Sequence, residues 1–387
     1  MSNLKQLAEL TQLPLLTVYQ ALAQLDAVPA AQRQQVQAAA ARLDYTLNVT
    51  IRDVAALAGL SVGTVSHVLN GSTRTRPETR QRVLQAIKDL NFQPNRIARS
   101  LKSNRARLIG YGWHKSEDPA RPNALLDRFL YDMAQTAESW GYHILTFAHP
   151  SHLSPSRYDE LMQSVRIDGL VLSDISYDDD RVRYLLGAGI PFVTFGRPNE
   201  DWPVPSVDVD GRLGMRLAVE HLLARGHQRI GLLCWPAGMR IGDVRVDGYR
   251  DALQAAGLPL DEALIGRIPN AVDHAAQAAL RLLTASTANG SPPTAIACAN
   301  DVMAVGVRRS LDQLGLRAGI DVAITGYDDS PVAELLGLTS IRQPIDTVAA
   351  RVVEMLIGEI EQTPVPRRAI TLEPTLVVRA SSRAQAL

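Results

Sequence analysis

The sequence predicts an α-helical headpiece made of tandem helix-turn-helix copies, followed by an α/β body of two doubly wound lobes. Three observations lead to this prediction. A chain of 387 residues can form two or three domains. Its first part repeats itself with a period of 47 residues, and from Leu108 onward strand-like apolar runs alternate with amphipathic helical segments.

The internal repeat covers the first 95 residues and needs no gap. The segment Leu4–Leu10 matches Ile51–Leu57, and later matches follow at the same spacing. They pair Leu13 with Leu60, Thr17-Val18 with Thr64-Val65, Leu22 with Leu69, Arg33-Gln34 with Arg80-Gln81, Val36 with Val83, Leu43 with Leu90, Tyr45 with Phe92 and Asn48 with Asn95. Two copies are too few for a solenoid, so we interpret residues 1–49 and 50–95 as a tandem duplication of one three-helix domain.

The second copy has the pattern of a helix-turn-helix. Asp53 can cap or charge the start of a first helix, Gly59 permits a sharp turn, and Ser61 caps a second helix of about residues 62–70. A third helix, about residues 77–90, has a proline in its first turn and packs on the other two. The apolar spacing turns Val65, Val68 and Leu69 inward and leaves Val62, Gly63, Ser66 and His67 outward. In this motif the second helix enters the major groove of DNA.

Positive charge is concentrated in the same segment. The whole chain is neutral, with 40 basic and 40 acidic residues, but residues 50–107 contain eleven Lys and Arg against three Asp and Glu. A segment with a net charge of +8, attached to an acidic body, is expected to contact the phosphate backbone of a nucleic acid.

The first copy departs from the pattern where DNA would be contacted. Pro14 replaces the capping serine, Leu15 and Leu16 occupy the base-facing start of the second helix, and residues 1–49 carry no net charge. We hypothesise that this degenerate repeat keeps the fold without independent DNA binding and serves as a packing or assembly module.

The body, residues 107–387, alternates strands with helices, which indicates parallel sheets covered on both faces. Expected strands are 108–111, 142–147, 169–172, 191–195, 230–233, 295–297 and 322–325, and expected helices include 126–140, 211–224 and 302–314. We expect lobe 1 at about 107–197 and 344–362, and lobe 2 at about 198–343 and 363–387. A ligand is then expected in the crevice outside the carboxyl ends of the strands.

Residues 50–104 resemble the DNA-binding headpiece of the LacI/GalR (lactose-repressor) family. The resemblance rests on "IRDVAALAGLSVGTVSHVLNG", "RPETRQRVLQAIKDLNFQPN" and "IARSLKSN". It implies that residues 96–106 form a hinge helix on operator DNA, in which Leu101 wedges into the minor groove with Ala98 packed beside it. We expect His67 and Ser66 to meet base edges, and Thr64 and Arg52 to lie nearer phosphates. The complete set of candidate DNA-binding residues is Arg52, Ser61, Val62, Gly63, Thr64, Ser66, His67, Asn70, Arg80, Asn95, Ala98, Arg99, Leu101 and Lys102.

The same resemblance continues through the body, in "RIDGLVLS", "GIPFVTFGR", "RVDGYRDAL", "ACANDVMAVGV" and "ITGYDDSPVA", and implies a fold like that of periplasmic sugar-binding proteins. It implies that a guanidinium, an amide and a carboxylate bind the hydroxyls of an effector, and that a loop around "NALL" faces the cleft. Leucines stand there in place of an aromatic pair, for which Trp113 or Phe195 could substitute. The candidate effector-binding residues are Trp113, Asn123, Leu126, Phe195, Arg245, Asn300 and Asp328. Alternatively, Asn300 and Asp328 cap helices and Arg245 forms a surface ion pair.

No motif for an enzyme, a cofactor or a metal is found. Gly110-Tyr111-Gly112 lacks the third glycine of a dinucleotide-binding loop, and the chain has no P-loop or nucleophile elbow. The two cysteines, Cys234 and Cys298, lie in apolar runs, which fits a reducing compartment. No apolar stretch approaches the length of a membrane span, so we expect a cytoplasmic protein.

These features together predict a transcription regulator, expected to be a repressor. A homodimer would bind a pseudo-palindromic operator, and a small sugar between the lobes would control the affinity. Two alternatives remain: the same architecture controlled by a purine or another metabolite as corepressor, and a sugar-binding module without DNA function.

Overall fold

The computed structural model describes residues 4–23, 25, 28–69, 75–92, 105–114, 123–149, 158, 160–199, 202–284, 291–363 and 368–383. The chain divides into two compact units, Met1–Ala106 and Arg107–Leu387. Each unit has its own hydrophobic core and is described by itself.

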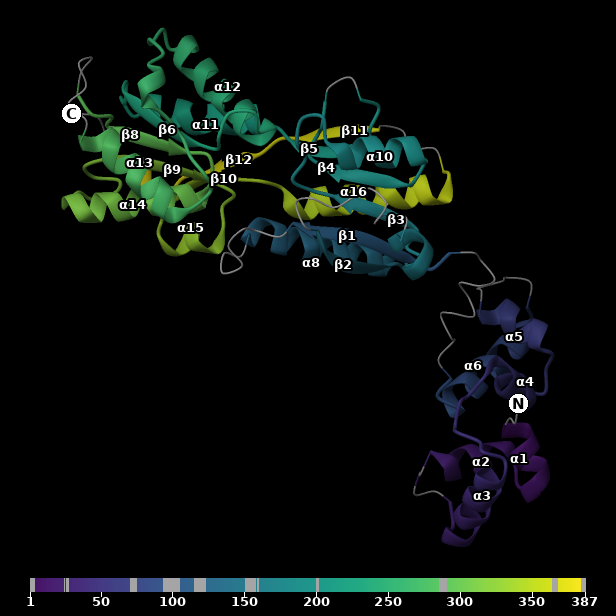
Figure 1. Cartoon of the computed structure of the whole chain (residues 1–387). Coiled ribbons are helices and arrows are strands. Elements are labelled where there is room, and N and C mark those ends of the chain that lie inside the picture. Colours follow the sequence, from purple (N-terminus) through teal and green to yellow (C-terminus); the bar gives the residue numbers. More distant parts are fainter. Residues whose placement is uncertain are drawn as a thin grey trace. The chain divides into compact units, whose positions relative to one another are not determined.

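In its described residues, the N-terminal unit has two successive sets of three helices (Figure 1). The first set is α1 (Leu4–Thr11), α2 (Leu15–Leu22) and α3 (Ala30–Arg42), and the second is α4 (Ile51–Ala58), α5 (Val62–Leu69) and α6 (Pro77–Asp89). Every helix of the second set begins and ends 47 residues after its counterpart in the first. The three helices expected in each copy are therefore present. Buried residues of both sets belong to one hydrophobic cluster, which includes Val18 and Val65.

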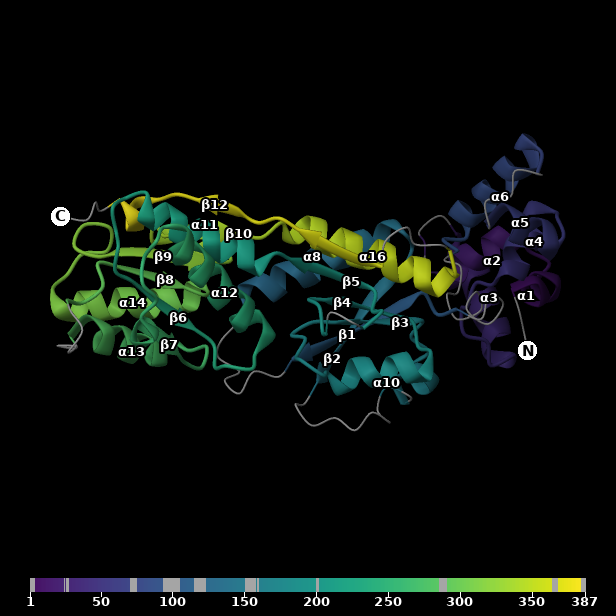
Figure 2. The same cartoon turned by 90° about the horizontal axis from the view of Figure 1, so that it is seen from above.

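The first lobe of the body is built on a six-stranded parallel sheet in the order β11-β5-β4-β3-β1-β2. Its strands are β1 (Leu108–His114), β2 (His143–His149), β3 (Gly169–Leu172), β4 (Phe192–Phe195), β5 (Ser206–Val209) and β11 (Ala369–Leu372). The helices described in this lobe are α8 (Ala124–Ser139), α10 (Asp180–Ala188) and α16 (Ile345–Glu361), with a one-turn π-helix at Leu161–Val165. Helices α8 and α16 lie side by side over one face, and α10 packs on the other (Figures 1 and 2).

The second lobe has a six-stranded sheet in the order β12-β10-β9-β8-β6-β7. Its strands are β6 (Ile230–Cys234), β7 (Ile265–Arg267), β8 (Ala295–Cys298), β9 (Ala323–Tyr327), β10 (Thr339–Arg342) and β12 (Thr375–Val377), of which only β12 is antiparallel to its neighbour. Its helices are α11 (Gly211–Leu223), α12 (Arg240–Ala255), α13 (Val272–Thr284), α14 (Asp301–Leu314) and the short α15 (Pro331–Leu335), with 3₁₀ turns at Glu262–Leu264 and Ala380–Ser382. The pair α11 and α12 covers one face, and the pair α13 and α14 covers the other (Figure 1).

The chain passes between the lobes three times. The passages follow β5, β10 and β11, because the elements after these strands pack on the other sheet. The predicted lobe boundaries are therefore wrong at two points: residues 198–209 and 363–372 carry β5 and β11, which belong to the sheet of lobe 1. The cause is that these strands are short and the sequence does not show which sheet a short strand joins.

The seven strands and three helices that the sequence predicts in the body are all present, each within four residues of the expected ends. The strands β3, β6 and β8 are buried along their whole length, as expected for parallel sheets between two helical layers. Within the described part of the chain, no helix has the length and apolar character needed to cross a membrane.

Candidate DNA-binding and effector-binding sites

Local hydrogen bonds fix both ends of helix α4. The backbone N–H and the hydroxyl of Thr50 donate to Oδ2 of Asp53 over 2.8 and 2.6 Å, so the start of the helix is capped as the sequence predicts. At the other end Gly59 has a φ of 62°, a left-handed conformation that favours glycine. The guanidinium of Arg82, on α6, donates to the carbonyl of Ala58 over 2.5 Å. Sequence reasoning missed this contact, since the spacing gives no sign of it.

Helix α5 begins at a serine cap and presents one exposed strip. Oγ of Ser61 accepts a hydrogen bond from the backbone N–H of Thr64 over 3.1 Å, which confirms the predicted cap. Three of the residues predicted to face outward, Val62, Gly63 and His67, are exposed. The fourth, Ser66, is half-buried. Because Val65 and Val68 anchor the opposite face in the core, the exposed strip is fixed relative to α4.

Two cationic side chains flank this strip in the sequence. Arg52 is exposed in the first turn of α4, and Arg80 is exposed in the first turn of α6. Thr64, predicted to lie near phosphates, is half-buried, and its hydroxyl lies 2.9 Å from that of Ser61. The DNA contacts of all these residues stay predictions. The remaining candidates lie outside the described residues: Asn70, Asn95, Ala98, Arg99, Leu101 and Lys102.

In the body, three candidate effector residues gather at the carboxyl ends of the strands of lobe 2. Arg245 lies on α12, which follows β6, while Asn300 follows β8 and Asp328 follows β9. Arg245 is only 3% exposed, so the alternative of a surface ion pair is wrong. Its guanidinium donates to the carbonyl of Ala299 and lies 3.6 Å from the centroid of the Tyr327 ring.

Two buried polar atoms of this cluster have no hydrogen-bond partner within the described residues. They are Nε of Arg245 and the hydroxyl of Tyr327. Buried polar groups are nearly always satisfied by protein, water or a ligand. These atoms therefore give the cluster hydrogen-bonding capacity that a polar ligand can use.

Asn300 acts as a helix cap. Its Oδ1 accepts from the backbone N–H of Met303 over 2.9 Å, and its Nδ2 donates to Oδ1 of Asn270 over 2.7 Å. The alternative of a capping role is thus confirmed for Asn300. Effector binding by Asn300 stays a prediction, and the neighbouring amide of Asn270 is a partner that sequence reasoning missed.

Asp328 does not cap a helix, since Ser330 is the cap of α15. Its backbone has a φ of 108°, and its Oδ1 accepts from Nε2 of Gln343 over 2.8 Å. Desolvation raises the pKa of Asp328 to about 7, and the nearby carboxylate of Asp301 acts in the same direction. Arg245 and the hydrogen bond from Gln343 oppose this shift without cancelling it.

The loop that carries Asp328 is held by Asp301, at the start of α14. Asp301 accepts from the backbone N–H of Ser330 over 2.8 Å and from the hydroxyl of Ser340 over 2.6 Å. A side chain at position 326 would overlap the Asp301 carboxylate. The close approach of the Asp301 carboxylate to the backbone at Gly326 therefore requires glycine at this position. Asp301 stands in "ANDV" directly after Asn300, but its partners are distant in sequence, so sequence reasoning missed it.

The candidates in lobe 1 lie at the carboxyl ends of its strands or just beyond them. Asn123 is exposed and caps α8, accepting from the backbone N–H of Leu126 over 3.3 Å. Leu126 is buried in the core of lobe 1, which favours a packing role. Phe195, at the end of β4, packs on Phe129 with 4.8 Å between ring centroids. Trp113 lies on β1, and its side chain is outside the described residues.

The carboxyl edges of the two lobes carry opposite charges within electrostatic range of each other. Asp208 on β5 of lobe 1 interacts with Arg240 on α12 of lobe 2, although desolvation still raises the pKa of Asp208. The two edges that carry the candidate effector residues therefore approach each other. Sequence reasoning missed Asp208.

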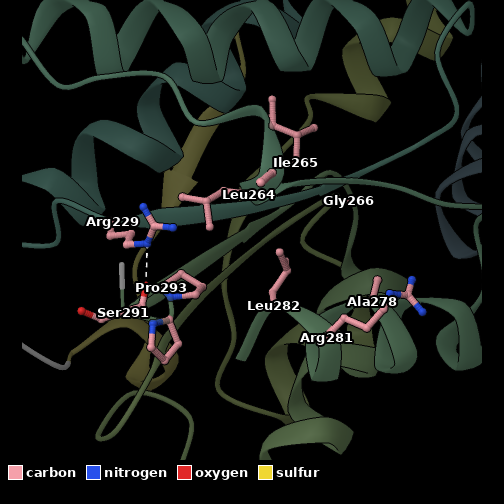
Figure 3. Close-up of a pocket in the computed structure, with 11 residues that line it drawn as sticks. Arg229, Leu264, Ile265, Gly266, Ala278, Arg281, Leu282, Ser291 and Pro293 are labelled. Atoms are coloured by element: carbon pink, nitrogen blue, oxygen red, sulfur yellow. Dashed lines mark hydrogen bonds between the residues drawn. The ribbon is translucent and has the colours of Figure 1, made fainter. Parts of the chain in front are cut away.

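A cavity of about 300 Å³ lies elsewhere in lobe 2, near the starts of β6 and β7 (Figure 3). Arg229 borders it and is held by the carbonyl of Ser291 over 2.6 Å and by Asp261 over 3.0 Å. No predicted effector residue lines this cavity. Because β6 and β7 are parallel, it lies at the edge of the sheet opposite Arg245 and Asp328.

Known proteins share both parts of this architecture. Residues 50–95 match the family model described as bacterial regulatory proteins, lacI family, and residues 219–382 match the periplasmic binding protein-like domain. The HTH-type transcriptional regulator CelR of Thermobifida fusca is 33% identical over 337 residues, which cover 86% of this chain and 98% of the relative. The transcriptional repressor PurR of Proteus mirabilis is 31% identical and covers 86% of this chain and 96% of its own length.

Solved structures agree with these relatives. A CelR–cellobiose complex is 31% identical, with a TM-score of 0.65, and the match covers 86% of this chain and 100% of that one. The lac repressor dimer bound to operator and the anti-inducer ONPF is 26% identical, with a TM-score of 0.71 over 87% of this chain and 99% of that one. A helix-turn-helix unit attached to a two-lobed α/β body defines a class of ligand-responsive DNA-binding regulators. The chain belongs to the LacI family of bacterial transcription regulators.

Proposed function

We propose that this protein is a homodimeric repressor that releases a pseudo-palindromic operator when a small sugar binds between its lobes. Residues 50–104 bind the operator, and the exposed strip of α5 reads base edges in the major groove. The sugar weakens DNA binding because it has different affinities for two arrangements of the lobes. DNA in bacteria is cytoplasmic, so the proposal places the protein there, without enzymatic activity.

The observation that carries the sugar assignment is the cluster at the carboxyl edge of lobe 2. A guanidinium, two amides and a carboxylate lie there together, supplied by Arg245, Asn270, Asn300 and Asp328. Such groups pair well with the many hydroxyls of a sugar, while aromatic faces cover its C–H surface. Trp235, whose ring centroid lies 5.2 Å from the Arg245 guanidinium, is a candidate for that cover.

The dimer is supported by exposed apolar side chains on both lobes. Tyr131 and Trp140, on or next to α8, are 60% and 51% exposed, and Val332 and Leu335 on α15 are 45% and 84% exposed. Both helices lie along the lower edge of the body in Figure 1. Exposed apolar surface of this kind is typical of a protein interface, and a two-fold dimer would match a two-fold operator.

A purine corepressor is the second candidate, because the repressor PurR of Proteus mirabilis is among the relatives, at 31% identity. A nucleobase requires aromatic stacking, and the segment Asn123–Leu126 offers leucines instead. The sugar is therefore favoured.

The test combines a thermal-shift screen with a gel shift on double-stranded promoter fragments. We expect a mono- or oligosaccharide to raise the melting temperature and to release the DNA. A purine that raises both the melting temperature and the DNA affinity would establish the alternative. If no fragment is retained even at low ionic strength, where nonspecific phosphate contacts are strongest, the repressor assignment is wrong.

A further inference from the structure

The function of the first three helices is assigned by neither family match, since the regulatory model begins at residue 50. CelR is matched over 98% of its own length but over only 86% of this chain. We propose that residues 4–49 are a second helix-turn-helix whose DNA-reading face packs inside the N-terminal unit, so that they stabilise the DNA-binding module and read no DNA themselves. This inference rests on the proposed function of residues 50–104.

The face of α2 that corresponds to the exposed strip of α5 is half-buried or buried along its length. At the spacing of 47 residues, Tyr19 stands in place of Ser66 and is 8% exposed. Leu15 and Leu16 stand in place of Val62 and Gly63, and both pack against the core of the unit. Apolar side chains packed in a core cannot read base edges, which requires polar groups or methyls inserted into the groove.

The polar side chains that cap α5 or are expected to contact phosphates in the second copy are replaced in the first copy or make other contacts there. Pro14 precedes α2 where Ser61 caps α5, and α2 has no side-chain cap. Arg33, the counterpart of the exposed Arg80, is half-buried and donates to the carbonyls of Leu25 and Val28 over 3.2 and 3.3 Å. This guanidinium is therefore committed to its own loop rather than directed to phosphates.

The two copies share one core. Helices α1 and α4 are in contact, and the buried side chains of both copies form a single hydrophobic cluster. Leu7 and its counterpart Val54 are both fully buried members of this cluster. Loss of the first copy would therefore remove packing partners of the second.

The connecting segment 43–49 joins the copies tightly instead of acting as a flexible linker. Its alternate residues pack against the common core: Leu43, Tyr45, Leu47 and Val49. The residues between them are exposed: Asp44, Thr46 and Asn48. Tyr45 also lies close enough to Asp53, in the first turn of α4, to interact with it electrostatically. Because every second residue of the segment is packed in the core, the segment holds the first copy beside the start of α4.

The shared core is tested on the full chain with Leu7→Ala, and Leu10→Ala is the matched control because Leu10 is 55% exposed on the same helix. The measurement is amide hydrogen exchange in peptides covering α4 and α5. We expect Leu7→Ala to accelerate exchange there by about tenfold or more and Leu10→Ala to leave it unchanged. Acceleration confined to residues 4–47 would show that the copies fold independently, and the inference would be overturned.

The loss of DNA reading is tested with Gln20→Ala, at the position equivalent to His67. We expect operator affinity and footprint length to stay within about twofold of the parent protein, whereas His67→Ala alters base preference. A tenfold loss of affinity with Gln20→Ala would mean that the first copy reads DNA. If neither the parent protein nor any variant binds DNA, the repressor proposal fails and with it the assignment of a DNA-binding module. The exchange experiment still decides whether the copies share a core.

Discussion

The guanidinium of Arg82, on α6, donates a hydrogen bond to the carbonyl oxygen of Ala58, the last residue of α4. The first copy has an equivalent hydrogen bond 47 residues earlier in the chain, because Gln35 on α3 donates to the carbonyl of Thr11 over 3.0 Å. The last carbonyls of a helix lack partners within the helix, so both contacts satisfy a group that would otherwise need water. The second copy adds a positive charge at the negative end of the helix dipole.

We therefore expect Arg82→Ala to destabilise the N-terminal unit by about 1–2 kcal/mol, because a charged hydrogen bond and a favourable dipole interaction are lost. Gln35→Ala should cost less, about 0.5–1 kcal/mol, since its hydrogen bond is neutral. The measurement is chemical denaturation of the full chain, followed by amide exchange in α4. Arg80→Ala is the matched control, as Arg80 is exposed and lies on the same helix. An equal loss for Arg80→Ala would show that the Ala58 contact is not the cause.

The sequence predicts the elements well wherever local chemistry decides them. The repeat, the turn at Gly59 and the serine cap at Ser61 specify the helices of residues 50–92, and all three helices are present. In the body, fully apolar strands such as β3 and β8 are recognisable because parallel sheets bury both of their faces.

The sequence does not predict contacts that the fold creates between distant segments. The bonds of Gln343 to Asp328 and of Ser340 to Asp301 join different elements of lobe 2 across the carboxyl edge of its sheet, and no spacing encodes them. The prediction of which sheet a strand joins fails for the same reason. Strand β11 pairs with β5, which lies more than a hundred residues away in the chain. Leu126 is apolar, and apolarity alone does not distinguish a cleft wall from the core in which it lies.

Arg245→Ala should abolish the response to the effector and leave operator binding intact. Arg245 is buried beside Asp328 and far in the sequence from the DNA-binding helices, so its loss removes a ligand contact without touching the DNA interface. The measurement is the release of promoter DNA by the identified sugar in a gel shift. Arg309→Ala is the control, because Arg309 is an exposed arginine paired with Asp273. Loss of DNA binding together with the response would mean that Arg245 supports the fold of the body.

Substitutions on the exposed strip of α5 should change which operator is preferred. His67→Ala, Val62→Ala and Gly63→Ala are suitable, and a Cβ at Gly63 meets no atom closer than 3.7 Å. Each lost base contact should alter discrimination at one base pair by about 1–3 kcal/mol. Selection from a randomised DNA library measures the preference.

Loss of a phosphate contact should lower the affinity for DNA without changing which operator is preferred. Arg52→Ala and Arg80→Ala should weaken binding to all sequences alike and lower the salt slope of the affinity by about one each. Titrations at several salt concentrations give the slope. A change of base preference with either arginine, or an unchanged slope, would place these residues away from the backbone.

The raised pKa of Asp328 should make stability depend on pH. In the folded protein this carboxyl keeps its proton up to a pH of about 7, whereas an aspartate in the unfolded chain ionises near a pH of about 4. Between these values the folded protein binds more protons than the unfolded chain, so the free energy of unfolding falls as the pH rises. Asp328→Asn removes this dependence and can still accept the hydrogen bond from Gln343. The melting temperature of the variant minus that of the parent should therefore be several degrees larger at pH 8 than at pH 5.

The control for this comparison is Asp312→Asn, because Asp312 is exposed on α14 of the same lobe. Its melting temperature should differ from that of the parent by the same amount at both pH values. Desolvation also raises the pKa of Asp301, although hydrogen bonds from Ser340 and Ser330 oppose this shift. Because the Asp301 carboxylate raises the pKa of Asp328, the two groups titrate over a broad range of pH. If the difference between Asp328→Asn and the parent were the same at pH 5 and pH 8, Asp328 would not titrate in this range, and a pKa of about 7 would be contradicted.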